Sequence, residues 1–449
     1  MFERLPALFR SALYALRGGF LVRPLAIALA LGAAGAILSS LEEQLHFVRG
    51  WVPEVLFPSQ QDPGVAQIIL GSIATSIMTV VSIVFAILLM TLTLASTQFS
   101  PRILISFVRD RTTQWTLGIF LGTFSYCMAA LPAARALPRP FVPAATVSGA
   151  MLLAIVCVAW LIYFIHHISQ SISVNHIVDR IARETELVIE EFMPYERGPF
   201  RLEELRDTAP VGEEGAPVLS RRSGYIRYID INRLIALARE YGICVHVVRR
   251  VGHFVPAGVP VIRVSKAERI SRDRELHLLA ALDVGPTRTM QQDVEFGIIQ
   301  IVDIALRAMS PAVNDPSTAI SCVDQLSRIT ICWLGREQPK TRYYAPPHVL
   351  RLVVPWLSLD RLIETAFDQI RHYAQADLSV SSRLIRACHD IATATPRRDE
   401  QELLVQLAQR VMAGCSRHLP DVDLQKLKRR IAPLEALIAE SDAGAPNAP

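Results

Sequence analysis

The sequence is poor in charged side chains, which make up only 20% of its 449 residues, whereas 51% are hydrophobic. Soluble domains carry about 25% charged residues, and the mean hydropathy of this chain is +0.31. These values predict a membrane part joined to a soluble part. The length is sufficient for more than one domain.

Long runs of basic residues are absent, and the formal net charge is only +4. Binding to nucleic acid is therefore not expected, because the phosphate backbone is recognised by clustered cations. The excess is mostly arginine, and its placement is more informative about orientation in a membrane.

No two cysteines have the spacing C-x-x-C, and their number is odd. This pattern argues against a disulfide framework and favours a reducing compartment. We expect no metal site and no cofactor. The cysteines are Cys127, Cys157, Cys244, Cys322, Cys332, Cys388 and Cys415.

Familiar catalytic motifs are also missing. The sequence contains no phosphate-binding G-x-x-x-x-G-K-[ST], no H-E-x-x-H, no G-x-S-x-G and no calcium loop of the EF-hand type. The only Cys-His-Asp string, at 388–390, consists of adjacent residues, which point in different directions on a helix. We therefore expect that the protein is not an enzyme.

Long apolar stretches are what the sequence does have. Four candidates for membrane spans lie at about 21–41, 68–95, 115–131 and 141–165. A span needs roughly 20 residues, so the third is short and extends to its flank at Trp115. The first lacks a clear cleavage site and is not expected to be a signal peptide. These stretches predict an α-helical membrane domain of four transmembrane helices over 1–166.

Arginines predict the orientation of these spans. Four precede the first span and three lie between the second and third, whereas one follows the first span and two follow the third. By the positive-inside rule, the N-terminus and everything after the fourth span lie in the cytoplasm. The first group is Arg4, Arg10, Arg17, Arg23, Arg102, Arg109 and Arg111; the second is Arg49, Arg135 and Arg139.

Ionisable residues are missing from the spans, apart from Arg23 at the edge of the first. This lowers the expectation of a proton-driven transporter without excluding a passive pore. Hydroxyl groups recur along the second span at three- and four-residue spacing. They indicate either close helix packing or a pore-lining face in an oligomer. These residues are Ser72, Thr75, Ser76, Thr79 and Ser82.

After the second span, the amphipathic run from Arg102 predicts a short helix on the inner leaflet. After the fourth, a helical pattern continues and predicts a helix at 167–194 that extends from the membrane. We then expect a linker at 195–220, a small mixed β domain at 221–285, a helical cytoplasmic domain at 286–440 that ends in a bundle, and a disordered tail at 441–449. The cytoplasmic part is thus α+β.

Within the β domain, the pattern predicts strands at 225–229, 244–249 and 259–264, and a helix at 232–241. The turn GHFVPAG at 252–258 has glycines where the backbone needs conformational freedom. It is similar to the sharp hairpin of small lipoyl-type barrels but carries no lysine that could be modified. We therefore expect a small β-barrel-like element.

The stretch SPAVNDPSTA at 310–319 joins two predicted helices, and Asp315 followed by Pro316 is typical of a helix start. Polar residues around this stretch form a candidate ligand-binding cluster, with helix capping and local ion pairing as the alternative. The candidates are Arg288, Asp293, Asp303, Arg307, Asn314, Asp315 and Asp324.

Several segments together resemble one family: the bacterial predicted inner-membrane proteins grouped as domain of unknown function 2254. The matching segments are LASTQFSPR (94–102), FIHHI (164–168), GYIRYID (224–230), GHFVPAGVP (252–260) and FGIIQIVDIALRAMSPAVNDPSTA (296–319). The chain departs from the family's G-x-E-R-T pattern at GPTRTMQQD (285–293). The resemblance implies a multi-pass protein of the bacterial inner membrane, and it implies no activity.

Two functions remain in view. In the first, the membrane domain anchors a cytoplasmic sensor or scaffold that binds a ligand or protein. In the second, the chain forms a homo-oligomeric passive ion channel or pore, gated by its cytoplasmic domain. Currents through purified protein in a planar bilayer would distinguish the two. In both, the lipid bilayer is a partner, and a homo-oligomer is expected.

Overall fold

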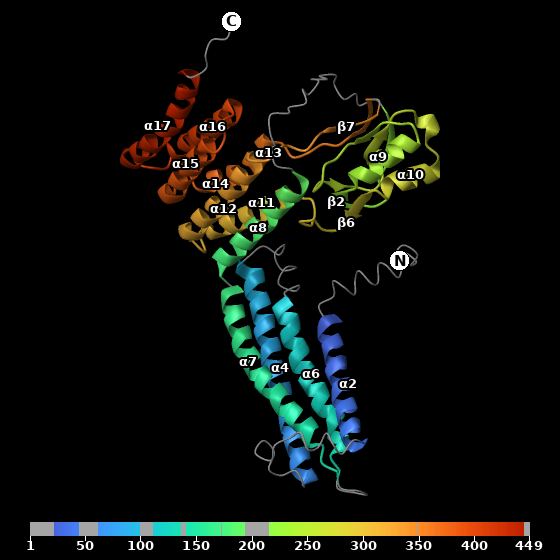
Figure 1. Ribbon diagram of the computed structural model, residues 1–449. Helices are drawn as coiled ribbons and strands as arrows, with labels where there is room; N and C mark the ends of the chain where they lie inside the picture. The colour runs from blue at the N-terminus through green and yellow to red at the C-terminus, as the bar shows by residue number, and fades with distance from the viewer. Residues whose placement is uncertain are drawn as a thin grey trace. The chain divides into compact units, whose positions relative to one another are not determined.

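The computed structural model describes residues 22–44, 62–98, 111–135, 141–171, 173–193, 215–346 and 348–443 (Figure 1). The chain divides into two compact units, residues 1–173 and residues 174–449. The inner-leaflet helix predicted from Arg102 falls mostly on 99–110, and most of the predicted tail on 444–449. Both stretches lie outside the described residues.

The first unit contains four long helices: α2 (Val22–Gln44), α4 (Pro63–Gln98), α6 (Arg111–Ala130) and α7 (Ala144–Ser171). All four are long and apolar enough to cross a membrane, which confirms the four candidate spans. The third is longer than the sequence predicted, because α6 begins at Arg111 and a 3-10 turn, Leu131–Ala133, continues it.

Helix α6 contacts the other three helices of this unit. It packs closely on α2 because small residues lie between them: a Cβ on Gly35 would come within 2.7 Å of the Tyr126 carbonyl oxygen. Ala28 and Gly32 lie on the same face of α2 as Gly35, whereas Ala36 is exposed. Close approach through small residues is typical of membrane helices.

The second unit begins with α8 (Val174–Phe192), so the helical pattern predicted to run on from the fourth span is divided between α7 and α8. The apolar face of α8 packs on α11 (Val294–Ala308) and α12 (Pro316–Leu334). Figure 1 shows these three helices side by side. The buried residues on α8 are Ile177, Val178, Ile181, Ala182, Thr185, Val188 and Ile189.

Two sheets follow. The larger has the order β1-β5-β3-β8-β7, and the smaller has the order β4-β2-β6. The strands are β1 (Ala216–Leu219), β2 (Gly224–Ile229), β3 (Val245–Val247), β4 (Phe254–Val255), β5 (Pro260–Val264), β6 (Leu282–Gly285), β7 (Arg342–Ala345) and β8 (Val349–Val353).

Neither sheet closes among the described residues, so the structure does not show the predicted barrel-like element. The GHFVPAG turn does form with positive φ at Gly252 and Gly258, as predicted. The strand within this turn and the strand after it belong to different sheets, however: β4 pairs with β2, and β5 pairs with β1 and β3. The hairpin therefore connects two sheets and does not close one.

Three strands arise in segments where the sequence predicted none. The hairpin β7–β8 lies inside the segment expected to be helical, and β8 pairs in parallel with β3, about a hundred residues earlier. Strand β1 lies inside the predicted linker. Parallel pairing joins distant segments, so local periodicity did not reveal it.

The β region has a core of its own, in which Ile226, Val245, Ile262 and Leu352 are fully buried. Helix α9 (Ile231–Glu240) packs against β8, and α10 (Arg272–Leu279) contacts α9. A 3-10 turn, Ala267–Arg269, precedes α10.

The remaining helices are α13 (Leu359–Ile363), α14 (Gln369–Tyr373), α15 (Leu378–Thr393), α16 (Arg398–Cys415) and α17 (Asp421–Ala443). Helix α15 contacts α12, α16 and α17, which gives the C-terminal helical region expected from the sequence. A π-helical turn, Glu364–Asp368, joins α13 to α14 and contacts α11. Turns of this kind often mark functional sites.

Candidate functional site: a buried ion cluster beside a pocket

Helices α11 and α12 begin in the same way, with an aspartate as N-cap. The Asp293 carboxylate accepts the Phe296 N–H at 3.1 Å, and the Asp315 carboxylate accepts the Thr318 N–H at 3.1 Å. Pro316 occupies the first turn of α12, as predicted. Each carboxylate satisfies a donor that the helix itself leaves unpaired.

The two caps differ in what else they bind. Among the described residues, Asp315 accepts from its own helix alone, including the Thr318 hydroxyl at 2.6 Å. Asp293 instead holds Arg288 through two bonds, from Nε at 2.7 Å and from Nη2 at 2.8 Å. The Asp293 side chain is 2% exposed. Paired donation of this kind fixes both the position and the plane of the guanidinium.

Glu295, on the first turn of α11, extends this pair into a cluster. Its carboxylate accepts Arg288 Nη2 at 3.1 Å and Arg250 Nη2 at 2.8 Å. Arg361 Nε lies 3.6 Å away, and the Thr365 hydroxyl donates from the π-helical turn at 3.4 Å. The cluster therefore ties together the β3–β4 connection, the start of α11 and the α13 region.

The charges in the cluster stabilise one another. Burial alone would raise the pKa of Glu295, but bonds from Arg250 and Arg288 outweigh burial and lower this pKa. Burial works against the charge of Arg288, yet Asp293 and Glu295 raise the pKa of that guanidinium. Burial, then Arg250, lowers the pKa of nearby His253, which favours its neutral form. Glu295 is thus held as an ionised structural partner and is unsuited to act as a general base.

Neighbouring backbone is shaped to fit this cluster. Gly252 has φ of +87°, and a Cβ there would lie 2.5 Å from Arg288 Nη2 and 2.6 Å from Asp293 Oδ2. Gln292, just before the cap, accepts the Ile229 N–H at 2.8 Å and so links α11 to strand β2. Glycine at 252 is therefore required both by its conformation and by the closeness of the ion pair.

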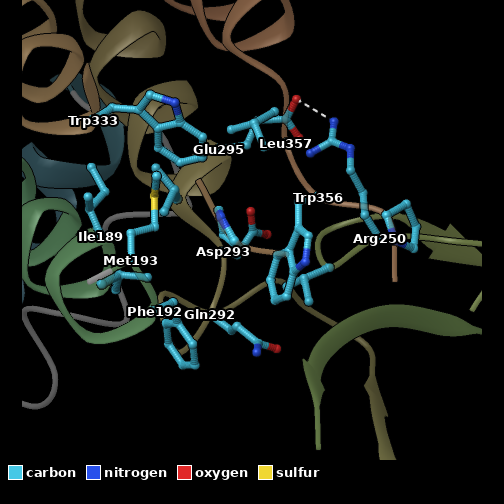
Figure 2. A pocket seen from close by; sticks show the side chains of 15 residues that line it. Ile189, Phe192, Met193, Arg250, Gln292, Asp293, Glu295, Trp333, Trp356 and Leu357 are labelled. Carbon is cyan, nitrogen blue, oxygen red and sulfur yellow. Dashed lines mark hydrogen bonds and ion pairs between the residues drawn. The ribbon is translucent and has the colours of Figure 1, made fainter. Parts of the chain in front are cut away.

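A pocket opens beside the cluster, with Asp293 and Glu295 in its wall (Figure 2). It encloses about 450 Å³, its solvent-open mouth included. The last turns of α8 form one side, and the connection from β8 to α13 forms another. The apolar lining residues are Val188, Ile189, Phe192, Met193, Val251, Val294, Trp333, Pro339, Pro355, Trp356 and Leu357.

Two tryptophans in the pocket wall differ in the hydrogen bonding of their indole N–H groups. Trp356 donates its N–H to the Lys340 carbonyl at 2.9 Å. Trp333 is 3% exposed, and its N–H has no hydrogen-bond partner among the described residues. Burial of a hydrogen-bond donor without a partner costs free energy. The Trp333 N–H is therefore an unsatisfied donor in the pocket wall.

Comparison with known proteins identifies the family. The family model described as "Predicted membrane protein (DUF2254)" matches residues 17–390. The chain belongs to this family. Uncharacterised proteins of Mycobacterium bovis and Mycobacterium tuberculosis are each 31% identical to it over 412 residues, which cover 89% of this chain and 78% of theirs. No solved structure matches the chain. The cluster and the pocket lie within the range matched by the DUF2254 model.

In this DUF2254 protein, the structure brings together two of the seven predicted ligand-binding residues, Arg288 and Asp293. Asp315 is a helix cap. Asp324 forms an ion pair with Arg383 of α15, and Asn314 is exposed with φ of +48°. Asp303 and Arg307 lie further along α11, and neither lines the pocket.

Sequence reasoning missed Glu295, Arg250 and both pocket tryptophans. The position of Glu295, two residues after the cap and within the first helical turn, was a usable signal. Arg250 gave none, because it reaches the cluster from the connection between two strands. Trp333 and Trp356 lie on opposite sides of the unpredicted β7–β8 hairpin, so their proximity depends on that hairpin.

Ion pairs hold helix α8 against α12 beside the pocket. Arg328 contacts Asp179 at 2.9 Å and also pairs with Glu186, while Arg336 pairs with Glu190 at 2.8 Å. Arg336 is buried and Arg328 is partly exposed. These contacts, added to the apolar face, fix α8 as part of the second unit.

The predicted pore-lining residues lie on the exposed face of α4 within the first unit. Their hydroxyls donate to their own helix: Thr75 to the Gly71 carbonyl at 2.9 Å, Thr79 to Thr75 at 3.1 Å and Ser82 to Met78 at 3.0 Å. Ser72 and Ser76 share this exposed face. Among the described residues, no group of three or more His, Cys, Asp or Glu could hold a metal ion.

Proposed function

We propose that this protein is a membrane-anchored sensor, in which the second unit binds a small molecule in the pocket beside the ion cluster. The observation that carries the proposal is the composition of the pocket wall. Val188, Ile189, Phe192 and Met193 place the end of α8 against any bound molecule. Helix α8 is the element that follows the last candidate span along the chain.

The ion cluster supports this role by keeping the opposite wall rigid. Arg250 and Glu295 line the pocket, and their bonds to the rest of the cluster fix their positions. A ligand would therefore meet one wall that is held in place and one that belongs to α8. Such an arrangement favours transmission of binding to α8, because a ligand that binds one position of this helix more tightly than another shifts the helix toward that position.

The proposal is tested by native mass spectrometry of the full-length protein after incubation with a metabolite extract of its host cells. We expect a small molecule to remain bound to the wild type and to be lost from Leu357→Trp, which narrows the pocket at a partly exposed position. Leu276→Trp, on α10 and outside the pocket wall, is the matched control. The same bound mass on all three proteins, or no bound mass on any of them, would contradict a sensor that uses this pocket.

We further propose that the protein lies in the bacterial inner membrane with its N-terminus and second unit in the cytoplasm. The distribution of arginines supports this orientation. Reporter fusions at the N-terminus and after residue 443 should both report the cytoplasm. A fusion after 443 that reports the other side would contradict the proposed topology.

A homo-oligomeric pore is the second candidate, and the exposed hydroxyl face of α4 favours it. These side chains do not pack inside one copy, so another copy could face them. Purified protein in a planar bilayer should then give currents that Ser76→Leu reduces. If no current appears across ions and voltages, the sensor proposal is favoured.

A further inference from the structure

The wall of the pocket restricts the chemistry of its ligand. We infer that the site takes a small neutral molecule with a flat apolar ring and one hydrogen-bond acceptor. This inference rests on the proposed function, because it names the class of ligand that the sensor would bind.

Neutrality follows from the pairing of charges around the pocket. Three arginines, Arg250, Arg288 and Arg361, face three carboxylates, Asp293, Glu295 and Glu364, and each arginine contacts at least one of them. The buried cluster and the exposed carboxylate of Glu364, which pairs with Arg361, together have no net charge. A charged ligand would leave water without gaining an unpaired counter-charge, which is unfavourable in a partly enclosed site.

A flat ring follows from the apolar lining. Trp333, Trp356 and Phe192 supply aromatic faces and edges, and Pro339 and Pro355 supply rigid apolar surfaces. Figure 2 shows Trp333 and Trp356 as separate parts of the wall, with Asp293 between them in this view. Aromatic side chains favour offset-stacked or edge-to-face partners.

The hydrogen-bond acceptor follows from the donors in the wall. The Trp356 N–H is engaged by the Lys340 carbonyl, and the Gln292 side chain is bonded to both the N–H and the carbonyl of Ile229. Trp333 Nε1 has no such partner among the described residues. A carbonyl or ether oxygen that reaches this indole after local adjustment of the wall would satisfy the donor.

Four probes that share a benzene ring test the inference on the full-length protein in lipid nanodiscs. They are acetophenone (neutral, with an acceptor), ethylbenzene (neutral, without one), benzoate and benzylammonium. Binding is measured by saturation-transfer NMR titration. The saturation-transfer signal that remains for the Leu357→Trp variant is attributed to partition of the probe into lipid. This signal is subtracted from that of the wild type.

We expect acetophenone to bind saturably and ethylbenzene to bind about fivefold to tenfold more weakly, the effect of one hydrogen bond. Benzoate and benzylammonium should not bind. Trp333→Phe should reduce acetophenone to the affinity of ethylbenzene, whereas Trp356→Phe should weaken both neutral probes by a similar factor. The second variant separates loss of the N–H from loss of ring area, and thermal unfolding confirms that each variant folds.

Binding of either charged probe as tight as that of acetophenone would overturn the inference, as would saturable binding by none of the four. Equal loss of both neutral probes in Trp333→Phe would overturn the role of the N–H. A charged metabolite found bound in the native mass experiment would leave the sensor standing and remove only the ligand class. An extract that yields no bound mass would instead remove the sensor, whatever the probes do.

Discussion

The two units of the chain satisfy their polar groups in different ways. In the first unit, the hydroxyls of α4 bond to carbonyls one turn back on the same helix. In the second, arginines bond across elements: Arg250 to Glu295, Arg328 to Glu186 and Arg383 to Asp324. In an apolar medium, each polar group needs a partner, and the nearest partner on a helix is its own backbone.

Other side chains in the first unit do bond across elements: Trp160 donates to the Thr116 hydroxyl at 2.9 Å, and Arg135 pairs with Glu43. A buried carboxylate does so as well. Glu42, near the end of α2, is 2% exposed and accepts the N–H groups of Ala145 and Thr146 at the start of α7, at 2.8 and 3.1 Å. It also accepts the Thr146 hydroxyl at 3.0 Å. A carboxylate from one helix thus caps another, as Asp293 caps its own. In both units, therefore, a buried carboxylate satisfies the N–H donors at a helix start.

The largest effect is expected where one buried carboxylate serves both as a helix cap and as the partner of an arginine. Asp293→Ala removes the α11 cap and leaves Arg288 without its paired carboxylate. Loss of one partner from a buried ion pair costs about 3–5 kcal/mol, so the second unit should unfold far more easily in denaturant. Glu364→Ala, at an exposed ion pair with Arg361, should cost about 0–1 kcal/mol. Similar losses for the two variants would show that the cluster does not stabilise the unit.

Gly252 and Gly258 both have positive φ, but only Gly252 lies against the ion cluster. Substitutions at the two positions therefore separate backbone strain from disturbance of the cluster. Gly258→Ala, with nothing within 4 Å of its Cβ, should cost about 1–3 kcal/mol from backbone strain alone. Gly252→Ala should cost more, because its Cβ would also displace Arg288 or Asp293. Chemical denaturation of both variants measures the difference. If the two cost the same, the cluster can move without penalty.

The α12 cap should have a smaller effect. Asp315→Ala removes one capping carboxylate, which is worth about 1 kcal/mol, whereas Asp315→Asn keeps an acceptor and should cost less. The Thr318 hydroxyl, then its backbone N–H, lowers the pKa of Asp315. Its contribution is therefore present above the ordinary aspartate pKa and disappears as the pH falls through the lowered value. The wild type should lose more stability than Asp315→Ala over that acidic range; a constant difference would contradict the cap.

The smallest effect is expected for a locally bonded hydroxyl in the first unit. Thr79→Val keeps the shape of the side chain and removes only a bond to its own helix. We expect a change of less than about 0.5 kcal/mol, because the backbone carbonyl keeps its helical partner. Thermal unfolding in nanodiscs measures it. A loss comparable to that of Asp293→Ala would mean that Thr79 bonds to another copy, as the pore requires.

The sequence predicted features that depend on neighbouring residues and missed features that depend on residues far apart in the chain. Apolar length predicted the four helices, and local chemistry predicted the Asp315 cap with Pro316 behind it. Gly252 and Gly258 were recognised as turn positions, but the sheets that they separate were not. The parallel pairing of β3 with β8 depends on residues far apart in sequence, and it also brings the tryptophan-bearing connections to the pocket. For this reason the sequence identified Arg288 and Asp293 and missed Arg250, Trp333 and Trp356.

Hydrogen exchange of α8 tests the central claim most directly. The full-length protein is compared with and without the host-cell metabolite extract, and peptides over 185–193 are followed by mass spectrometry. The sensor predicts slower exchange in these peptides for the wild type and for Leu276→Trp, and no change for Leu357→Trp. Exchange that the extract leaves unaltered in the wild type would contradict a ligand pocket that acts on α8.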